Sequence, residues 1–268
     1  MSEIITMTTP AIRASGLTAG YHARAVLSGI DLDVPAGRIT TIIGPNGCGK
    51  STLIKTLGRL LRPTAGEITL GDQSLSSLRA KQIAQRLAIL PQNPMAPEGL
   101  VVRDLVARGR QPHQPWYRQW SAEDDRVVDD AMEATGVIDL GDRPLDELSG
   151  GQRQRAWIAM SLAQQTDLLL LDEPTTHLDL AHAVEVLDLV VQLRDRTART
   201  VLMVLHDLSL AARYSDHLIV MKDGRVHAQG SPADVLEPTL LDEVFGLSAH
   251  VFADPVDGLP TVVPTSHA

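Results

Sequence analysis

One segment has the residue types and spacing of a phosphate-binding loop. Residues 44–51 read Gly-Pro-Asn-Gly-Cys-Gly-Lys-Ser, which fits the pattern G-x-x-x-x-G-K-[ST], between an apolar run and a predicted helix. The glycines allow backbone N–H groups to surround a phosphate, and the following helix presents its positive end to the anion. The Lys50 ammonium would neutralise the outer phosphates of a nucleotide, and the Ser51 hydroxyl is a candidate Mg²⁺ ligand. The predicted nucleotide-binding residues are Gly44, Pro45, Asn46, Gly47, Cys48, Gly49, Lys50, Ser51 and Thr52.

Two carboxylates follow a second apolar run. Residues 168–171 are all leucine, and Asp172 and Glu173 come directly after them, before a proline. Because neighbouring side chains on an extended chain point in opposite directions, the two carboxylates can have different roles. Asp172 would face the metal ion, and Glu173 would orient or deprotonate an attacking water molecule. Acidic residues can also simply end a strand before a turn, but together with a phosphate-binding loop the pair indicates nucleotide hydrolysis.

A third segment, residues 148–152, reads Leu-Ser-Gly-Gly-Gln and precedes a predicted helix over residues 153–164. Ser149 is well placed as the N-cap of this helix, and a cap contributes about 1 kcal/mol. The two glycines leave backbone N–H groups uncovered at the same place. The segment is therefore either an ordinary helix cap or a second cradle for an anion.

The elements around these segments predict an α/β fold. Its 268 residues suit one large domain or two small ones, at roughly 150 residues per domain. Short apolar runs alternate with helical patterns, which indicates a mostly parallel sheet with helices on its faces. Residues 93–157 lack strand-like runs and are predicted to be a helical insertion, with a capping box at Ser121–Asp124. The predicted strands are 40–43, 87–90, 168–171, 200–205 and 217–221, and the predicted helices are 50–61, 121–136, 180–195 and 208–214, with an exposed loop at 113–120.

The composition excludes several classes of protein. A formal net charge of −9 argues against a nucleic-acid-binding protein, which usually has a basic face. The single cysteine, Cys48, excludes an intrachain disulfide and indicates a reducing compartment. No apolar stretch approaches the 18 residues of a membrane span, and the N-terminal residues lack the pattern of a signal peptide. We expect a cytosolic protein, or one that is bound to a membrane only through a partner.

Together these motifs resemble those of the ATP-binding subunits of ABC transporters, over nearly the whole chain. Residues 148–152 match the ABC signature, which other P-loop proteins lack. The resemblance implies a P-loop NTPase core with a mostly parallel sheet, an N-terminal antiparallel β subdomain and an inserted helical subdomain. The expected ABC ATPase domain covers residues 10–250, its helical subdomain about 93–157, and a C-terminal extension 251–268.

The resemblance also implies roles for three single residues. Tyr21 would stack on adenine, although a lone strand tyrosine is weak support by itself. Gln92 corresponds to the Q-loop glutamine, which senses Mg²⁺ and the membrane partner; otherwise it would be a polar loop residue. His206 corresponds to the switch histidine, which would bind the terminal phosphate and hold the water and Glu173; otherwise it is a structural histidine at a strand end. The expected catalytic residues are Glu173, His206 and Gln92, and the expected metal ligands are Ser51, Gln92 and Asp172.

Residues 177–179 (His-Leu-Asp) match the D-loop of the family, in which Asp179 shapes a dimer interface. Thr176 and His177 stand where many relatives carry Ser-Ala, so His177 is not assigned a catalytic role. In the family, the phosphate loop of one subunit faces the signature of another across ATP. The chain is therefore expected to act as a dimer, with Ser149, Gly150, Gly151, Gln152 and Asp179 contacting the partner's nucleotide.

The implied activity is hydrolysis of ATP to ADP and phosphate, with Mg²⁺, coupled to transport. Two copies would bind integral-membrane permease subunits at the cytoplasmic face of the membrane, a substrate-binding protein would act indirectly, and no nucleic acid would be involved. Residues 106–115 and 251–260 are similar to segments of iron–siderophore importers, with importers of haem or cobalamin as alternatives. Two alternative functions are an ABC ATPase that works without a permease and a small-molecule kinase. The short, acidic chain disfavours the first, and the signature together with His206 disfavours the second.

Overall fold

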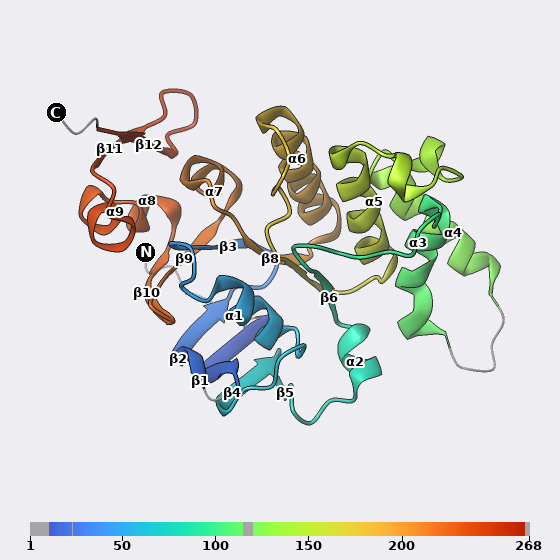
Figure 1. Cartoon of the computed structure of the whole chain (residues 1–268), viewed down its shortest axis with the longest axis horizontal. Coiled ribbons are helices and arrows are strands. Elements are labelled where there is room, and N and C mark those ends of the chain that lie inside the picture. The colour runs from blue at the N-terminus through green and yellow to red at the C-terminus, as the bar shows by residue number, and fades with distance from the viewer. Residues whose placement is uncertain (1–10, 23, 115–119, 266–268) are drawn as a thin grey trace, which may run out of the picture. The chain divides into compact units, whose positions relative to one another are not determined.

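The computed structural model describes residues 11–22, 24–114 and 120–265 (Figure 1). The chain forms two compact units. The first consists of Met1–Leu78 and Asp207–Ala268, and the second of Arg79–His206. The phosphate-binding loop belongs to the first unit, whereas the paired carboxylates and the signature belong to the second.

The first unit contains a four-stranded antiparallel sheet with the strand order β2-β1-β4-β5. Along β1 the buried and exposed side chains largely alternate, which is the pattern of a strand with one face on a core. Ile12, Leu17 and Ala19 are fully buried on that face. This sheet corresponds to the N-terminal antiparallel subdomain that the sequence predicts. Its strands are β1 (Ile12–Tyr21), β2 (Arg24–Val34), β4 (Ala65–Leu70) and β5 (Gln73–Ser74).

The same unit holds the strand that precedes the phosphate-binding loop. Strand β3 (Ile39–Ile43) is buried at every position and pairs in parallel with β9 (His217–Lys222), which pairs antiparallel with β10 (Arg225–Gly230). Helix α1 (Lys50–Leu57) follows the loop, and the C-terminal residues form the hairpin β11–β12 (Figure 1). The remaining elements of this unit are α7 (Leu208–Tyr214), α8 (Pro232–Val235), α9 (Pro238–Phe245), β11 (Ala249–Ala253) and β12 (Pro260–Pro264).

The second unit is built on three parallel strands, β6, β7 and β8. All four residues of β7 are buried leucines, as expected for a strand that is covered on both faces. Helix α5 packs against α3 and α4 in the helical part of the unit, and α6 lies beside α5 (Figure 1). The elements are α2 (Ala80–Ala84), β6 (Leu87–Leu90), α3 (Val102–Ala107), η1 (Arg108–His113), α4 (Ala122–Ala134), η2 (Ile138–Leu140), η3 (Leu145–Glu147), α5 (Gly150–Ala163), β7 (Leu168–Leu171), α6 (Leu180–Thr197) and β8 (Thr200–Val204).

The predicted α/β class is confirmed, with parallel pairs in both units. Helix α1 is shorter than predicted because Arg59 takes a left-handed conformation (φ 57°) and the Leu60 N–H turns back to the Lys55 carbonyl. Helix α5 begins earlier than predicted, at Gly150. Most of the loop predicted at 113–120 lies outside the described residues. Over the part of the chain that the structure describes, no helix combines the length and the apolar character needed to cross a bilayer.

Candidate functional site

The phosphate-binding loop lies between the buried strand β3 and helix α1, as its sequence pattern predicts. Two of its glycines are required by geometry. Gly49, the N-cap of α1, has φ 107°, which is unfavourable for residues with a side chain. A Cβ atom on Gly44 would lie 2.3 Å from the Met221 carbonyl oxygen. The loop therefore keeps its backbone tightly curved, and bulky side chains are excluded from these two positions.

The cation of the loop is buried within it. The Lys50 side chain is among the buried polar groups, and its Nζ donates to the carbonyl oxygens of Gly44 at 2.8 Å and of Pro45 at 3.1 Å. No side chain caps the N-terminus of α1, so its positive end is left for an anion. Burial raises the pKa of the Cys48 thiol, against the opposing effect of Lys50. This shift disfavours the thiolate, so Cys48 is a small loop residue rather than a nucleophile.

Tyr21 and the phosphate-binding loop line the same hollow. This hollow has a volume of about 920 Å³, and its lining includes Tyr21, Val26 and Gly47. Tyr21 is the last residue of β1 and is 44% exposed, which is unusual for a large aromatic side chain unless it is used at a surface. An aromatic ring and a phosphate-binding backbone on one hollow suit a nucleotide, whose base and phosphates need these two surfaces.

Glu173 is held in a strained turn at the end of β7. Its φ is 56°, a left-handed value that is uncommon for residues other than glycine, asparagine and aspartate. The side chain is buried, as is that of Asp172 before it. Strained, buried acidic residues are found preferentially at functional sites.

Three side chains hold the Glu173 carboxylate. Gln92 Nε2 donates to Oε2 at 2.5 Å, and the Thr176 hydroxyl donates to the same oxygen at 3.0 Å. His206 Nε2 lies 2.7 Å from the other oxygen, Oε1. Gln92 follows β6, Glu173 follows β7 and His206 follows β8, and the registers of these parallel strands bring their carboxyl ends level. The structure thus brings together Glu173, Gln92 and His206, the three residues that are expected to be catalytic, two of them through the family resemblance alone.

Thr176 is the member of this group that sequence reasoning missed. Its hydroxyl reaches Glu173 because the left-handed turn at Glu173 folds the chain back, and the Thr176 N–H bonds to the Glu173 carbonyl. The only signal in the sequence is the dipeptide at 176–177, which departs from the usual Ser-Ala. Thr176 and the serine that many relatives carry at this position both have a hydroxyl, so either residue could donate to Glu173.

The signature residues form a capping box at the start of α5, as predicted. Ser149 Oγ accepts from the Gln152 N–H at 3.3 Å, and Gln152 Oε1 accepts from the Ser149 N–H at 3.1 Å. Ser149 and Gly150 are exposed, whereas Gly151 is buried. The helix therefore presents its positive end and a bare glycine backbone to the outside.

Asp179 caps the next helix, α6. Its Oδ1 accepts from the backbone N–H of His182 at 2.9 Å and lies 2.7 Å from His182 Nδ1. These two hydrogen bonds lower the pKa of Asp179. His177 is exposed and has φ 67°. Among the described residues, no group of three or more histidine, cysteine, aspartate or glutamate side chains is arranged to hold a metal ion.

Comparison with known proteins identifies the family. Residues 27–176, more than half of the chain, match the family described as ABC transporter. The chain belongs to the ABC transporter family. It is 49% identical over 254 residues to the petrobactin import ATP-binding protein FpuD of Bacillus anthracis, covering 95% of this chain and 93% of that protein. It is 46% identical over 253 residues to the ferric enterobactin transport ATP-binding protein FepC of Escherichia coli (strain K12), covering 94% of this chain and 93% of that protein.

A solved ABC transporter structure in an inward-facing conformation has a related fold. Its TM-score against this chain is 0.84 at 27% sequence identity, with 97% of this chain and 98% of that chain covered. The predicted identity as an ATP-binding protein of the ABC family is therefore confirmed, together with the predicted fold class.

Residues 109–113, within the segment 106–115 that resembles iron–siderophore importers, also have a structural role. Gly109 has no room for a side chain, because a Cβ atom would lie 2.2 Å from the Met160 carbonyl oxygen. Arg110 is buried and donates to Asp124 at 2.9 Å and to the Ala163 carbonyl at 2.8 Å. Burial alone would raise the pKa of Asp124, but hydrogen bonds from Ser121 and Arg110 outweigh it and lower that pKa. The motif fastens η1 to the C-terminal end of α5.

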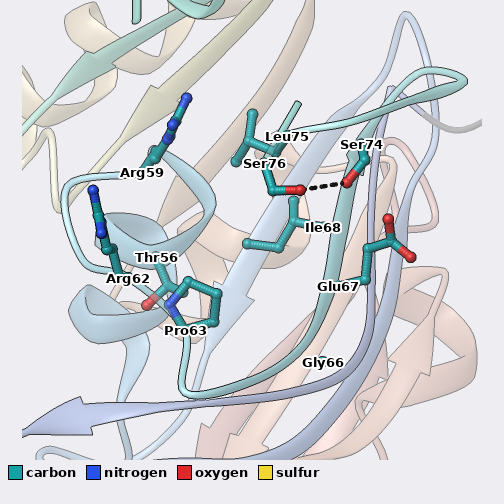
Figure 2. Close-up of a pocket in the computed structure, with 10 residues that line it drawn as sticks. All are labelled: Thr56, Arg59, Arg62, Pro63, Gly66, Glu67, Ile68, Ser74, Leu75 and Ser76. Carbon is teal, nitrogen blue, oxygen red and sulfur yellow. Dashed lines mark hydrogen bonds between the residues drawn. The ribbon is translucent and has the colours of Figure 1, made fainter. Parts of the chain in front are cut away.

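A second hollow lies beyond the other end of α1 (Figure 2). Its volume is about 680 Å³, and Arg59 and Arg62 project side by side at its edge while Ile68 and Leu75 supply apolar surface. None of the ABC site residues predicted from the sequence is among those labelled in Figure 2. Of these two hollows, the one that contains Tyr21 therefore carries the residues that are predicted to bind the nucleotide.

Proposed function

We propose that this chain is the ATP-hydrolysing subunit of an importer that takes up iron–siderophore complexes through separate permease subunits. The observation that carries the proposal is the 46–49% identity to FpuD and FepC, whose names specify import of petrobactin and transport of ferric enterobactin, over more than nine-tenths of both chains. The segments 106–115 and 251–260, which resemble those of siderophore importers, support the same branch. The chain would work at the cytoplasmic face of the membrane, bound to the permease.

ATP would bind in the hollow that Tyr21 and the phosphate-binding loop share. Tyr21 would stack on the adenine, and residues 44–52 would surround the phosphates. The Lys50 ammonium, which now donates to carbonyl groups of its own loop, would donate to phosphate oxygens instead. Because the reaction needs mainly positioning and charge neutralisation, this loop supplies much of what phosphoryl transfer requires.

Glu173 would be the general base. Its carboxylate would accept a proton from the attacking water, or orient that water, while His206 holds the terminal phosphate and the water in place. Gln92 contacts the same carboxylate, so a movement of the Q-loop would change the position of the base. This contact offers a direct route by which a permease bound near Gln92 would control hydrolysis.

The residues that the family resemblance assigns to the metal, Ser51, Gln92 and Asp172, all carry oxygen donors, which Mg²⁺ prefers as ligands. Bound with ATP, Mg²⁺ would neutralise charge on the outer phosphates. Ser51 would offer its hydroxyl, Gln92 its amide oxygen and Asp172 its buried carboxylate.

We propose further that the working form is a dimer of this chain. The capping box of the signature leaves Ser149 and Gly150 exposed at a positive helix end, and Asp179 is exposed beside α6. These residues, with Gly151 and Gln152, would complete the nucleotide site of a second copy. Each copy would thus hold half of each of two ATP sites.

The transport function can be tested with the membrane subunit that co-purifies with the tagged chain from detergent-solubilised membranes. Reconstituted in vesicles with the binding protein, the complex is expected to hydrolyse ATP several-fold faster when a ferric siderophore is supplied, because hydrolysis is gated through the permease. Phosphate release and ⁵⁵Fe uptake would be measured against ferric catecholate, ferric hydroxamate, haem and cobalamin. Stimulation by haem or cobalamin alone would refute the siderophore assignment, and no stimulation or uptake with any of them would refute the transport function.

Replacing Tyr21 with alanine is expected to weaken ATP binding about tenfold, because base–aromatic stacking is worth about 1–3 kcal/mol per base. Tyr21→Trp should restore binding. Titration with a fluorescent ATP analogue would measure the affinity for ATP, and competition by inorganic tripolyphosphate would serve as the control. The variant should bind tripolyphosphate as the parent does; an equal loss for both ligands would show that Tyr21 does not contact the base.

A further inference from the structure

The side chain of His182 joins two segments that the proposed function uses for the same purpose. It lies in the first turn of α6, three residues after Asp179. Its Nδ1 is 2.7 Å from Asp179 Oδ1, and its backbone N–H donates to the same oxygen. Its ring also lies against the signature: a Cβ atom added to Gly151 would be only 2.8 Å from His182 Cδ2. One imidazole therefore contacts both the D-loop aspartate and the start of α5.

Side chains of the D-loop and of α6 lie close to both signature glycines, although only Gly151 is buried. A Cβ atom on Gly150 would approach Leu178 Cδ2 to 3.3 Å, and one on Gly151 would meet the Cδ2, Cγ and Cβ atoms of His182. A distance of 2.8 Å is shorter than carbon atoms normally approach each other, so a residue larger than glycine at 151 would displace the imidazole. The ring of His182 thus sets the distance between the signature backbone and α6.

An ordinary helix cap would not need this arrangement. Asp179 already caps α6 by accepting from backbone N–H groups, including that of His182, and any residue other than proline at position 182 supplies that N–H. The second hydrogen bond, from the imidazole, adds a charge-assisted contact. Because the His182 side chain is 45% exposed and that of Asp179 is 67% exposed, neither is retained for a hydrophobic core.

We propose that His182 is a positioning residue that holds Asp179 and the signature segment Ser149–Gln152 at a fixed spacing, so that both reach the second copy's nucleotide site together. The inference rests on the proposed dimer and goes beyond it, because it assigns a role to a residue that touches no nucleotide. The Nδ1–H group donates to the Asp179 carboxylate, and the Cδ2 side of the ring sets the distance to Gly151. The hydrogen bond to Asp179 carries most of this effect, so its loss releases the two segments from each other, and the ring contact with Gly151 adds a smaller part.

Three substitutions separate the two contacts. His182→Asn keeps an N–H donor at the position of Nδ1, His182→Phe keeps a ring over Gly151 but has no donor, and His182→Ala removes both. Each would be placed in the Glu173→Gln chain, in which slow hydrolysis allows ATP to hold the dimer together. Sedimentation would give the dimer dissociation constant at saturating ATP, and a fluorescent ATP analogue would give the affinity of the single chain at low protein concentration.

His182→Ala is expected to weaken the ATP-dependent dimer about tenfold or more, as loss of a hydrogen bond to a charged group implies, and to change the single chain's ATP affinity less than twofold. His182→Asn should recover most of the dimer affinity and His182→Phe little of it. Glu185→Ala is the matched control: it breaks the exposed ion pair with Arg155 at 3.2 Å between the same two helices, and should leave both constants unchanged.

The outcomes are distinguishable. Dimer formation by His182→Ala equal to that of its Glu173→Gln parent, or equal weakening by Glu185→Ala, overturns the positioning role while the proposed dimer stands. If the parent itself forms no dimer with ATP, the proposed dimer fails and the inference fails with it. A thermal unfolding curve accompanies each variant, and where His182→Ala does not fold, the comparison of His182→Asn with His182→Phe decides the proposal.

Discussion

Replacing Glu173 with glutamine is expected to slow ATP hydrolysis by about 10²–10⁴-fold, the usual contribution of a general base. The amide cannot accept the proton of the attacking water. It can nevertheless keep the native contacts: its carbonyl oxygen can accept from Gln92 and Thr176, and its NH₂ group can face a His206 nitrogen. ATP affinity should therefore change by less than about threefold, since a satisfied hydrogen-bond network is retained. Single-turnover phosphate release and direct ATP titration would measure the two quantities.

The control for this substitution is Glu185→Gln, which neutralises an exposed carboxylate on α6 and should leave hydrolysis unchanged. A second readout comes from assembly, because a dimer that binds ATP without hydrolysing it should accumulate on a sizing column. If Glu173→Gln hydrolyses ATP at the parental rate, Glu173 is not the base and the three contacts to its carboxylate have another purpose.

The helix caps could be predicted from the sequence because both partners lie within one turn. Ser121 with Asp124, and Ser149 with Gln152, form the reciprocal hydrogen bonds that a spacing of three residues allows. The same is true of the phosphate-binding loop, whose glycine and lysine positions follow from local backbone geometry. Such local features need no knowledge of which strand lies beside which.

The contacts around Glu173 could not be derived in this way. Gln92 is 81 residues away in the sequence, and it meets Glu173 only because Leu90 pairs with Leu171 in register. The family resemblance supplied the roles of Gln92 and His206. Their convergence on one carboxylate depends on how α5 and α6, which lie in the connections between these strands, pack against the sheet. Parallel registers are set by such crossover helices, which no local pattern specifies.

Two further contacts could not be predicted from the sequence. The Thr176 hydroxyl reaches Glu173 only because Glu173 adopts a left-handed conformation that its residue type disfavours. The ring of His182 covers Gly151 only because α6 packs on α5. At Arg110, the likeness to siderophore importers suggested a marker of the substrate but gave no structural role. The structure shows that Arg110 forms a buried ion pair with Asp124, whose disruption would cost about 3–5 kcal/mol.

The second large effect concerns the shared site. Lys50→Ala removes the loop cation, and Gly150→Asp places a negative charge at the exposed signature, where it opposes phosphate but suits the N-terminus of α5. Each variant alone is expected to lose more than about 99% of its ATPase activity, because every site of its dimer is damaged. An equimolar mixture should recover to about a quarter of the parental rate: half of the dimers are mixed, and each of these has one intact site.

The recovery arises because the undamaged loop of the Gly150→Asp chain meets the undamaged signature of the Lys50→Ala chain. The control is a chain that carries both substitutions. Mixed with either single variant it leaves every site damaged, so no activity should return, although the same number of mixed dimers forms. Phosphate release would be followed while differently tagged chains confirm that subunits exchange. Exchange without recovery would mean that each chain uses its own signature, and the shared site, on which the roles of Asp179 and His182 also depend, would have to be abandoned.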